Sequence, residues 1–309
     1  MVIAIGTGLL FPALAELCLP YIFLALFFVV VFSMNSLEES PIEILRKIDT
    51  FTWTIVSWQM FIVPAIVTLL CVAMEAVPLV TMILLATTTA GSVFASPALV
   101  EMAGLNRRLA VRTMIISTVL MPFSLLVFGT MSDILPPDMS FETYGLHIVN
   151  YLIIPLIISH LFWKLKPIIG QRTSASLVRY MGFGSTFALM VFCIGVMSKI
   201  HVGDVIGSVD LFLYFVIAVG LSVVMYILTG ILFARFGRVD SLTAGMLVAN
   251  RNVALSFGLL AEVFPNEVMI YVAVSQFPIF LTPLVIRVYR MVQDAYREHS
   301  NAGPFPNTD

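Results

Sequence analysis

Apolar stretches of about 20 residues recur along this sequence, and they limit what the chain can fold into. A helix needs roughly 20 predominantly apolar residues to cross the ~30 Å hydrocarbon layer of a bilayer. Hydrophobic residues make up 60% of the 309 residues and charged residues only 11%, whereas a soluble domain has about 25% charged residues. We therefore predict an all-α polytopic membrane protein, with residues 1–309 forming a single membrane domain in the lipid bilayer.

Hydropathy and helix breakers together predict ten transmembrane helices. The boundary between the first two spans depends on Pro12 and Glu16. The first apolar stretch begins at Met1 with no basic segment before it, so we do not expect a cleaved signal peptide. The expected spans are 1–14, 15–34, 52–73, 78–103, 109–130, 146–163, 179–198, 211–233, 240–263 and 267–289.

The basic residues test this number of spans independently. In a ten-span arrangement, the loops of one face hold nearly all of the 16 Lys and Arg residues, and the opposite loops hold only Lys199. Lys and Arg concentrate on the cytoplasmic side of membrane proteins. We therefore predict a multi-pass protein of the cell inner (plasma) membrane, with both termini cytoplasmic and a cytoplasmic tail over 294–309. The residues on the basic face are Arg46, Lys47, Arg107, Arg108, Arg112, Lys164, Lys166, Arg172, Arg179, Arg235, Arg238, Arg287, Arg290 and Arg297.

Two polar interruptions occur at corresponding places in the two halves of the chain. A shift of 161 residues, which lays Pro122 on Pro283, also lays 87–92 (TTTAGS) over 248–253 (VANRNV). An odd number of spans separates the copies, so they are expected to lie in opposite orientations. We predict two inverted five-helix repeats in which crossing helices 4 and 9 are discontinuous. Paired interrupted helices at corresponding positions indicate the binding site of a transporter.

These interruptions supply the candidate substrate-binding residues. A broken helix exposes N–H and C=O groups that a bilayer tolerates only where protein buries them or a wet cavity receives them. The positive dipole ends of half-helices favour anions. An arginine near the bilayer centre costs about 2.5–3.5 kcal/mol on insertion scales, so Arg251 is expected to be paired and functional. The candidates are Thr88, Thr89, Gly91, Ser92, Asn250, Arg251 and Asn252.

Each of these assignments has a structural alternative. Serine and threonine commonly form hydrogen bonds within packed membrane helices, and the three threonines at 87–89 could do only that. Arg251 could pair permanently with Glu101 or Glu262 and never contact a substrate. Those two acidic residues occupy corresponding positions in the two halves, where they could also be solvated span ends, gates or proton sites.

The whole chain resembles the bile acid/sodium symporter family, within the bile/arsenite/riboflavin transporter superfamily. The resemblance rests on 58–64 (WQMFIVP), Gly91 to Pro97, Ser117-Thr118 with Pro122, and 250–255 (NRNVAL). It implies a core domain over approximately 50–130 and 205–293, and a panel domain over approximately 1–34 and 144–198 that moves against the core. It also implies an organic anion substrate taken up with sodium, contact of Asn252 with that substrate, and sodium-site positions at Gln59 and Ser96.

The sequence departs from this family at the sodium sites. The acidic residue of the family corresponds to Leu247, and the glutamine before the crossing asparagine corresponds to Arg251. Further ligand positions hold Pro97, Ala110 and Met114. Because a carboxylate is lost and a guanidinium is gained, we expect Arg251 to replace a sodium ion and transport not to require sodium.

The expected function is therefore secondary transport of a small, carboxylate-type organic anion by alternating access. A sodium-coupled symporter with rebuilt sodium sites is one alternative, and a non-transporting ligand-binding membrane sensor is another. The sequence indicates neither an enzyme nor a cofactor, because it has no nucleophile elbow, phosphate-binding loop or dinucleotide glycine pattern. Its four His and three Cys have no metal-site spacing. The net charge of −2, with no basic patch, indicates no nucleic-acid partner.

Overall fold

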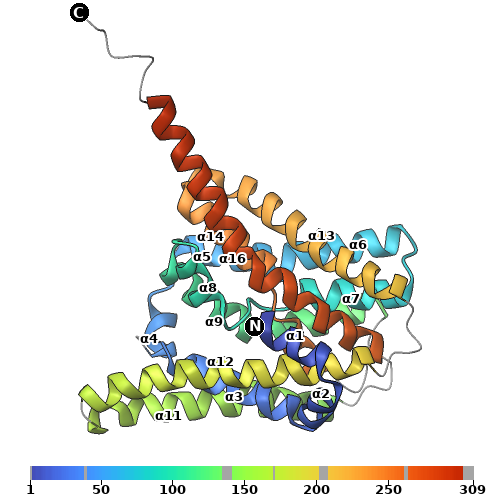
Figure 1. Ribbon diagram of the computed structural model, residues 1–309, viewed down its shortest axis with the longest axis horizontal. Helices are drawn as coiled ribbons and strands as arrows, with labels where there is room; N and C mark the ends of the chain where they lie inside the picture. Colours follow the sequence, from blue (N-terminus) through green and yellow to red (C-terminus); the bar gives the residue numbers. More distant parts are fainter. Residues whose placement is uncertain are drawn as a thin grey trace, which may run out of the picture.

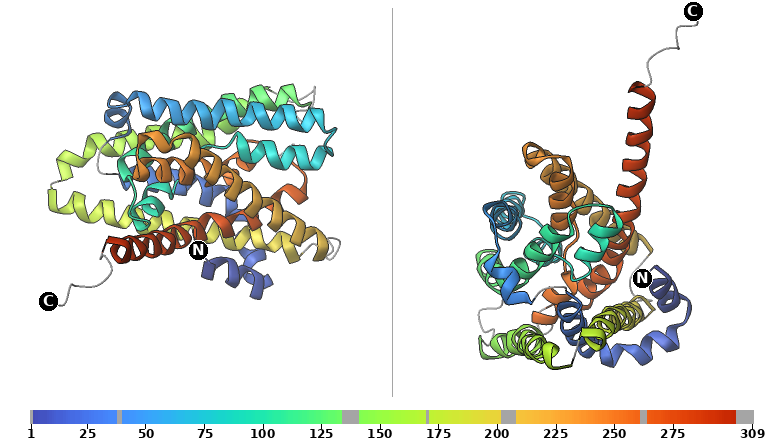
Figure 2. Two further views of the ribbon diagram at one scale, coloured as in Figure 1. Left: turned by 90° about the horizontal axis from the view of Figure 1, so that it is seen from above. Right: turned by 90° about the vertical axis from the view of Figure 1, so that its left-hand side faces the viewer.

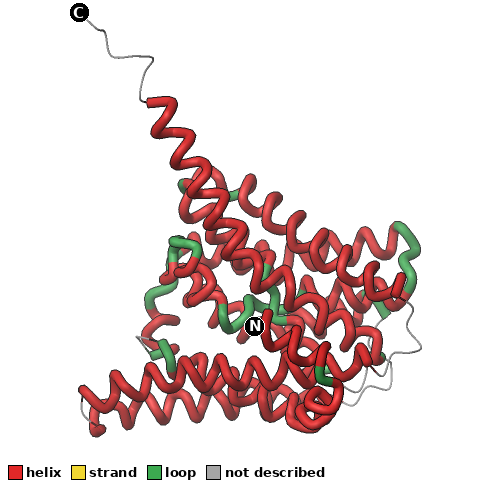
Figure 3. Tube along the Cα trace, viewed as in Figure 1, coloured by secondary structure: helices red, strands yellow, loops and turns green. Residues whose placement is uncertain are grey.

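The computed structural model describes residues 2–37, 40–133, 141–169, 171–201, 208–260 and 264–301. All regular elements in these segments are helical, apart from one isolated bridge (Figure 3). The elements of the first half are α1 (Val2–Leu10), α2 (Pro12–Cys18), η1 (Leu19–Tyr21), α3 (Ile22–Asn35), α4 (Pro41–Arg46), α5 (Thr50–Ser57), η2 (Trp58–Ile62), α6 (Val63–Ala73), α7 (Pro78–Thr88), α8 (Ser96–Met102) and α9 (Arg107–Met131). Those of the second half are α10 (Phe141–Ile148), η3 (Val149–Ile153), α11 (Ile154–Ile169), α12 (Gln171–His201), α13 (Ser208–Leu232), η4 (Ala234–Phe236), α14 (Arg238–Ala249), α15 (Val253–Leu259) and α16 (Asn266–Asn301).

Seven helical segments among the described residues are long and apolar enough to cross a membrane. This confirms the prediction of an all-α polytopic membrane protein. The interrupted helices α7–α8 and α14–α15 are not among these seven, because each piece is too short to cross alone. The seven segments are Pro12–Asn35, Thr50–Ala73, Arg107–Met131, Glu142–Lys166, Ser176–Ser198, Leu211–Leu232 and Glu267–Val292.

The N-terminal helices differ from the prediction. The expected boundary between residues 14 and 15 is wrong, because α2 continues from Pro12 to Cys18 and leads through η1 into α3. The helix breaks instead at Phe11, where φ is −124° and ψ is 80°. Proline disfavours helical geometry in the residue before it, which explains a break directly before Pro12. The remaining α1 has 9 residues and is too short to cross a bilayer by itself.

The C-terminal helix continues into the expected tail. Helix α16 runs through Asn301, so the first part of the expected cytoplasmic tail over 294–309 is helical. Figure 1 shows this helix extending beyond the rest of the molecule. Residues 302–309, which complete the expected tail, and Glu262 lie outside the described residues.

The helices form two groups that pack against each other. In one group α3 packs along α12, with α1, α2 and α11 beside them. The other group contains α5 to α9 and α13 to α16, in which α13 packs on α14 and α16. In Figure 1, α3, α11 and α12 lie along the lower edge of the molecule, below α13, α14 and α16, and Figure 2 gives two further views of this arrangement. They meet where α12 contacts α16 and where α15 contacts α3.

Both stretches that were expected to be discontinuous are interrupted. Helix α7 continues through Thr88, and the hydroxyls of the three threonines at 87–89 donate to carbonyls one turn earlier in their own helix. The chain is then non-helical until α8 begins at Ser96. In the second half, only residues 250–252 separate α14 from α15. Asn252 caps α15, since its Oδ1 accepts from the Leu255 N–H at 3.3 Å.

Candidate functional site at the two helix interruptions

The two interruptions meet and pair with each other. The Val93 N–H donates to the Asn250 carbonyl at 3.1 Å, and the Asn252 N–H donates to the Gly91 carbonyl at 2.8 Å. Ser92 and Arg251 thereby form an antiparallel bridge. Backbone groups that a broken helix leaves without partners must be satisfied inside a membrane protein, and here each interruption satisfies part of the other.

Gly91 brings this crossing against α9. A Cβ at Gly91 would lie 3.0 Å from the backbone C and O of Ser117 and from the backbone N of Thr118. The neighbouring Ser92 N–H donates to Ser117 Oγ at 3.0 Å. The position therefore requires glycine for close approach of two backbones, and the hydrogen bond fixes the register between the interruption and α9.

The guanidinium of Arg251 lies inside the crossing and bonds backbone carbonyls. Nε donates to the Val248 carbonyl at 2.6 Å. Nη1 donates to the carbonyls of Gln59 at 3.1 Å, Thr88 at 3.2 Å and Ala90 at 2.9 Å. The residue is only 2% exposed, so one cation satisfies the ends of both interrupted helices and a third segment, η2.

The expected alternative, a permanent ion pair between Arg251 and Glu101, is not present. Glu101 pairs with Arg107 at 3.3 Å, and no carboxylate among the described residues pairs with Arg251. Arg251 Nη2 is buried and has no hydrogen-bond partner in the described protein. A buried charge normally needs a partner, which makes this nitrogen the chemically incomplete part of the site.

Gln59 connects η2 to the same crossing. Its side chain is completely buried and contacts Ser92. In the amide orientation that satisfies both of its polar atoms, Oε1 accepts from the Ser92 N–H at 3.1 Å and from Arg251 Nη1 at 3.3 Å. Single π-helical turns such as η2 occur frequently at functional sites, and this one places both the carbonyl and the amide of Gln59 against the guanidinium.

A cavity of about 160 Å³ reaches the crossing from between the two helix groups. On one side it is lined by Ser33 of α3 and Ser185 of α12, and on the other by Phe94, Arg251 and Asn252. Asn252 Nδ2, like Arg251 Nη2, is buried and has no hydrogen-bond partner in the described protein. Two nitrogen donors on lining residues therefore have capacity for a ligand with acceptor atoms.

The structure brings the predicted substrate residues together but gives them different roles. The backbones of Gly91, Ser92 and Asn250 build the crossing, and Arg251 and Asn252 line the cavity. The hydroxyls of the two threonine candidates donate to their own helix instead. Thr88 contributes its carbonyl to Arg251 and lines a second, water-sized cavity of about 20 Å³ that also reaches Arg251. Thr89 lines neither cavity.

Sequence reasoning missed the residues on the opposite wall of the larger cavity. Ser33 donates from Oγ to the Phe94 carbonyl at 3.1 Å, which links α3 to the first interruption. Ser185 and Thr186 of α12 line the same wall. The sequence does not show that such a serine lines a cavity, because a serine that only packs between two apolar helices occurs in the same sequence pattern.

The positions that correspond to the family's sodium ligands offer few side-chain oxygens. Leu247, Ala110 and Met114 are completely buried apolar residues, and Ser96 Oγ is buried without a hydrogen-bond partner in the described part of the chain.

No protein-family model matches the chain, and no curated protein matches it either. The function is therefore inferred from the geometry of the crossing and its cavity.

Proposed function

We propose that this protein is a secondary transporter of a small, carboxylate-type organic anion and that it works by alternating access. The observation that carries this proposal is the environment of Arg251. Its guanidinium is fixed by backbone carbonyls at the meeting point of two broken helices, has no described carboxylate partner and keeps Nη2 unsatisfied. It also lines the cavity of about 160 Å³.

The cavity is lined by two arginines, Arg107 and Arg251, and one carboxylate, Glu101, so its net charge and its hydrogen-bonding capacity favour an anion. Guanidinium and carboxylate groups form strong, charge-assisted hydrogen bonds with matching geometry. Arg251 Nη2 and Asn252 Nδ2 both have donor capacity left in the described structure. Both nitrogens are buried, so a carboxylate in the cavity would complete their hydrogen bonding after a small rearrangement of the crossing, and it would provide the negative charge that the guanidinium lacks.

The same environment argues against a bound sodium ion. Sodium would need several oxygen ligands, and the carbonyls of Gln59, Thr88, Ala90 and Val248 already accept from Arg251. A second cation close to the guanidinium would also be repelled in a low-dielectric site. We propose that the fixed positive charge of Arg251 takes the place of a co-transported sodium ion, so that uptake proceeds without sodium.

Alternating access would use the separation of the helices into two groups. We propose that the chain contains ten membrane segments in two inverted repeats, in which the short α1 is a first, partial segment and the interrupted helices α7–α8 and α14–α15 are the fourth and ninth. The group with α3 and α12 would be the panel domain of the resembled family, and the group with the crossing would be its core. The cavity lies between them, where rocking of one group against the other would alternately expose it.

A reconstituted assay tests this function. Purified protein in proteoliposomes is expected to take up small radiolabelled carboxylates saturably and equally well in sodium and potassium chloride. Asn252→Ala is expected to reduce the apparent affinity by at least about tenfold, since a hydrogen bond to a charged group contributes roughly 1.5–3 kcal/mol. The matched control is Asn150→Ala, at an exposed residue of η3, which is expected to leave uptake unchanged.

The same experiment separates the alternatives. Uptake that requires sodium would contradict the proposed role of Arg251 and favour rebuilt sodium sites. Thermal stabilisation by a carboxylate without uptake would favour a ligand-binding sensor. If none of the carboxylates tested stabilises the protein or enters the vesicles, the proposal of an anionic substrate is contradicted.

A further inference from the structure

A further pocket lies where α9 begins, and it shares only two lining residues, Leu37 and Arg107, with the larger cavity at the crossing. Its volume is about 270 Å³. Four of its seven lining residues are basic, three are aliphatic and none is acidic. The basic residues are Lys47, Arg107, Arg108 and Arg112, and the aliphatic ones are Leu37, Ile44 and Val111.

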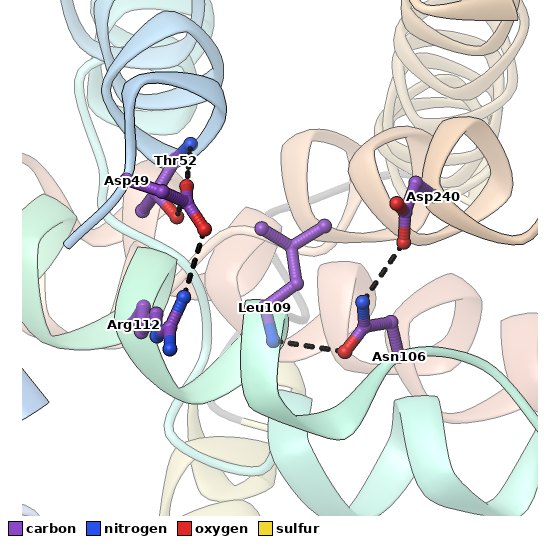
Figure 4. Close-up of polar contacts among 6 residues, drawn as sticks. All are labelled: Asp49, Thr52, Asn106, Leu109, Arg112 and Asp240. Carbon is purple, nitrogen blue, oxygen red and sulfur yellow. Dashed lines mark hydrogen bonds and ion pairs between the residues drawn. The ribbon is translucent and has the colours of Figure 1, made fainter. Parts of the chain in front are cut away.

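The α9 end of this pocket is held in place by polar contacts (Figure 4). Arg112 Nη1 donates to Asp49, the N-cap residue of α5, at 2.8 Å. Asn106 caps α9 by accepting from the Leu109 N–H at 3.2 Å, and its Nδ2 donates to Asp240 Oδ1 at 2.8 Å. The basic wall is therefore built on a fixed helix end rather than on a free loop.

An anion would be favourable at this position for two physical reasons. Arg107 and Arg108 occupy the first turn of α9, where the positive end of the helix dipole disfavours cations and favours anions. Guanidinium groups also match the oxygen geometry of phosphate. Arg108 is exposed, so its donors are accessible to a group that enters the pocket.

The aliphatic residues and the position along α9 indicate the kind of anion. The segment that is apolar enough to cross a membrane begins at Arg107, which places the pocket at the boundary of the hydrocarbon layer. Basic pockets between membrane helices bind phospholipid headgroups. We infer that this pocket binds the phosphate group of an anionic phospholipid, with Leu37, Ile44 and Val111 against the glycerol and the first acyl carbons.

Native mass spectrometry on the full-length purified protein tests this inference. Dioctanoyl phosphatidylglycerol is expected to remain bound as a one-to-one adduct, whereas dioctanoyl phosphatidylcholine at the same concentration is not. Each basic residue near a membrane surface contributes about fivefold in affinity. Arg108→Gln is therefore expected to weaken phosphatidylglycerol binding about fivefold, and the matched control Arg287→Gln, at an exposed arginine of α16, is expected to leave it unchanged.

Two further measurements give the outcomes that would overturn the inference. Inorganic phosphate that displaces phosphatidylglycerol at comparable concentration would show a soluble anion site instead of a lipid site. Equal retention of both lipids, or full retention by an Arg108→Gln variant with an unaltered melting temperature, would contradict the proposed site.

Discussion

Gly91→Ala gives the sharpest test of the crossing geometry. The new methyl group would lie 3.0 Å from three backbone atoms of α9, those of Ser117 and Thr118. Ordinary contacts of a Cβ begin at 3.4 Å, so two backbones must separate by a few tenths of an ångström. The contacted atoms belong to the backbone and not to the flexible end of a side chain, so they cannot move aside easily. Overpacking of this kind costs about 1–3 kcal/mol, and the shift would also strain the hydrogen bond between the Gly91 carbonyl and the Asn252 N–H.

In a chain of 309 residues, the expected loss of about 2 kcal/mol corresponds to a melting temperature that is about 3 °C lower. A thermal melt of detergent-purified protein measures it, and proteoliposome uptake measures the effect on the site. The matched control is Gly230→Ala in α13, where a Cβ would meet nothing within 4 Å. Alanine favours a helix by up to about 1 kcal/mol over glycine, so this control should melt at the same or a higher temperature. A Gly91→Ala protein that melts and transports like the wild type would refute the close approach.

Three further predictions concern the charged groups. Arg251→Gln combined with Leu247→Glu restores the amide and carboxylate of the resembled family, and we expect sodium to raise the melting temperature of this variant but not of the wild type. Asn252→Asp should weaken carboxylate binding at least about tenfold by repulsion while shifting the melting temperature little, because aspartate also caps a helix; equal affinity in a binding titration would place the substrate elsewhere. Partial burial raises the pKa of Asp49, but hydrogen bonds from Thr52 and the charge and hydrogen bond of Arg112 lower it more, so this pKa lies below 3.8. The contribution of Asp49, below about 1 kcal/mol for such an exposed pair, is therefore present at neutral pH and lost only as the pH falls below 3.8. The melting temperatures of wild type and Asp49→Asn should converge there, and a difference that persists at low pH would contradict this assignment.

The sequence predicted the interruptions because their polar residues conflict with a membrane helix. An arginine between two asparagines in an apolar span has few structural explanations, and the helix does break at residues 250–252. The first interruption was placed slightly too early, at residues 87–92. The threonine hydroxyls bond their own helix, which continues through Thr88, and the break extends to Ala95.

The partners of Arg251 could not be predicted from residue types. They are backbone carbonyls, which every residue carries, and the Thr88 carbonyl is 163 positions away in the sequence. The cavity was equally hidden, because it depends on which faces of α3 and α12 meet the crossing. At the N-terminus, the direct effect of Pro12 on Phe11 decided the helix boundary, and a polar residue further along, Glu16, did not.

The bridge between Ser92 and Arg251 has a consequence for how this protein can change shape. Its backbone hydrogen bonds and the guanidinium tie α7, α8, α14 and α15 to one another at a single point, so displacement of one half-helix must carry the other three with it. Independent hinging of either broken helix would first require several buried hydrogen bonds to open together. Sliding between this unit and the α3–α12 pair is mechanically the softer mode, since described side-chain links such as Ser33 to Phe94 are single hydrogen bonds that can re-form at a new register.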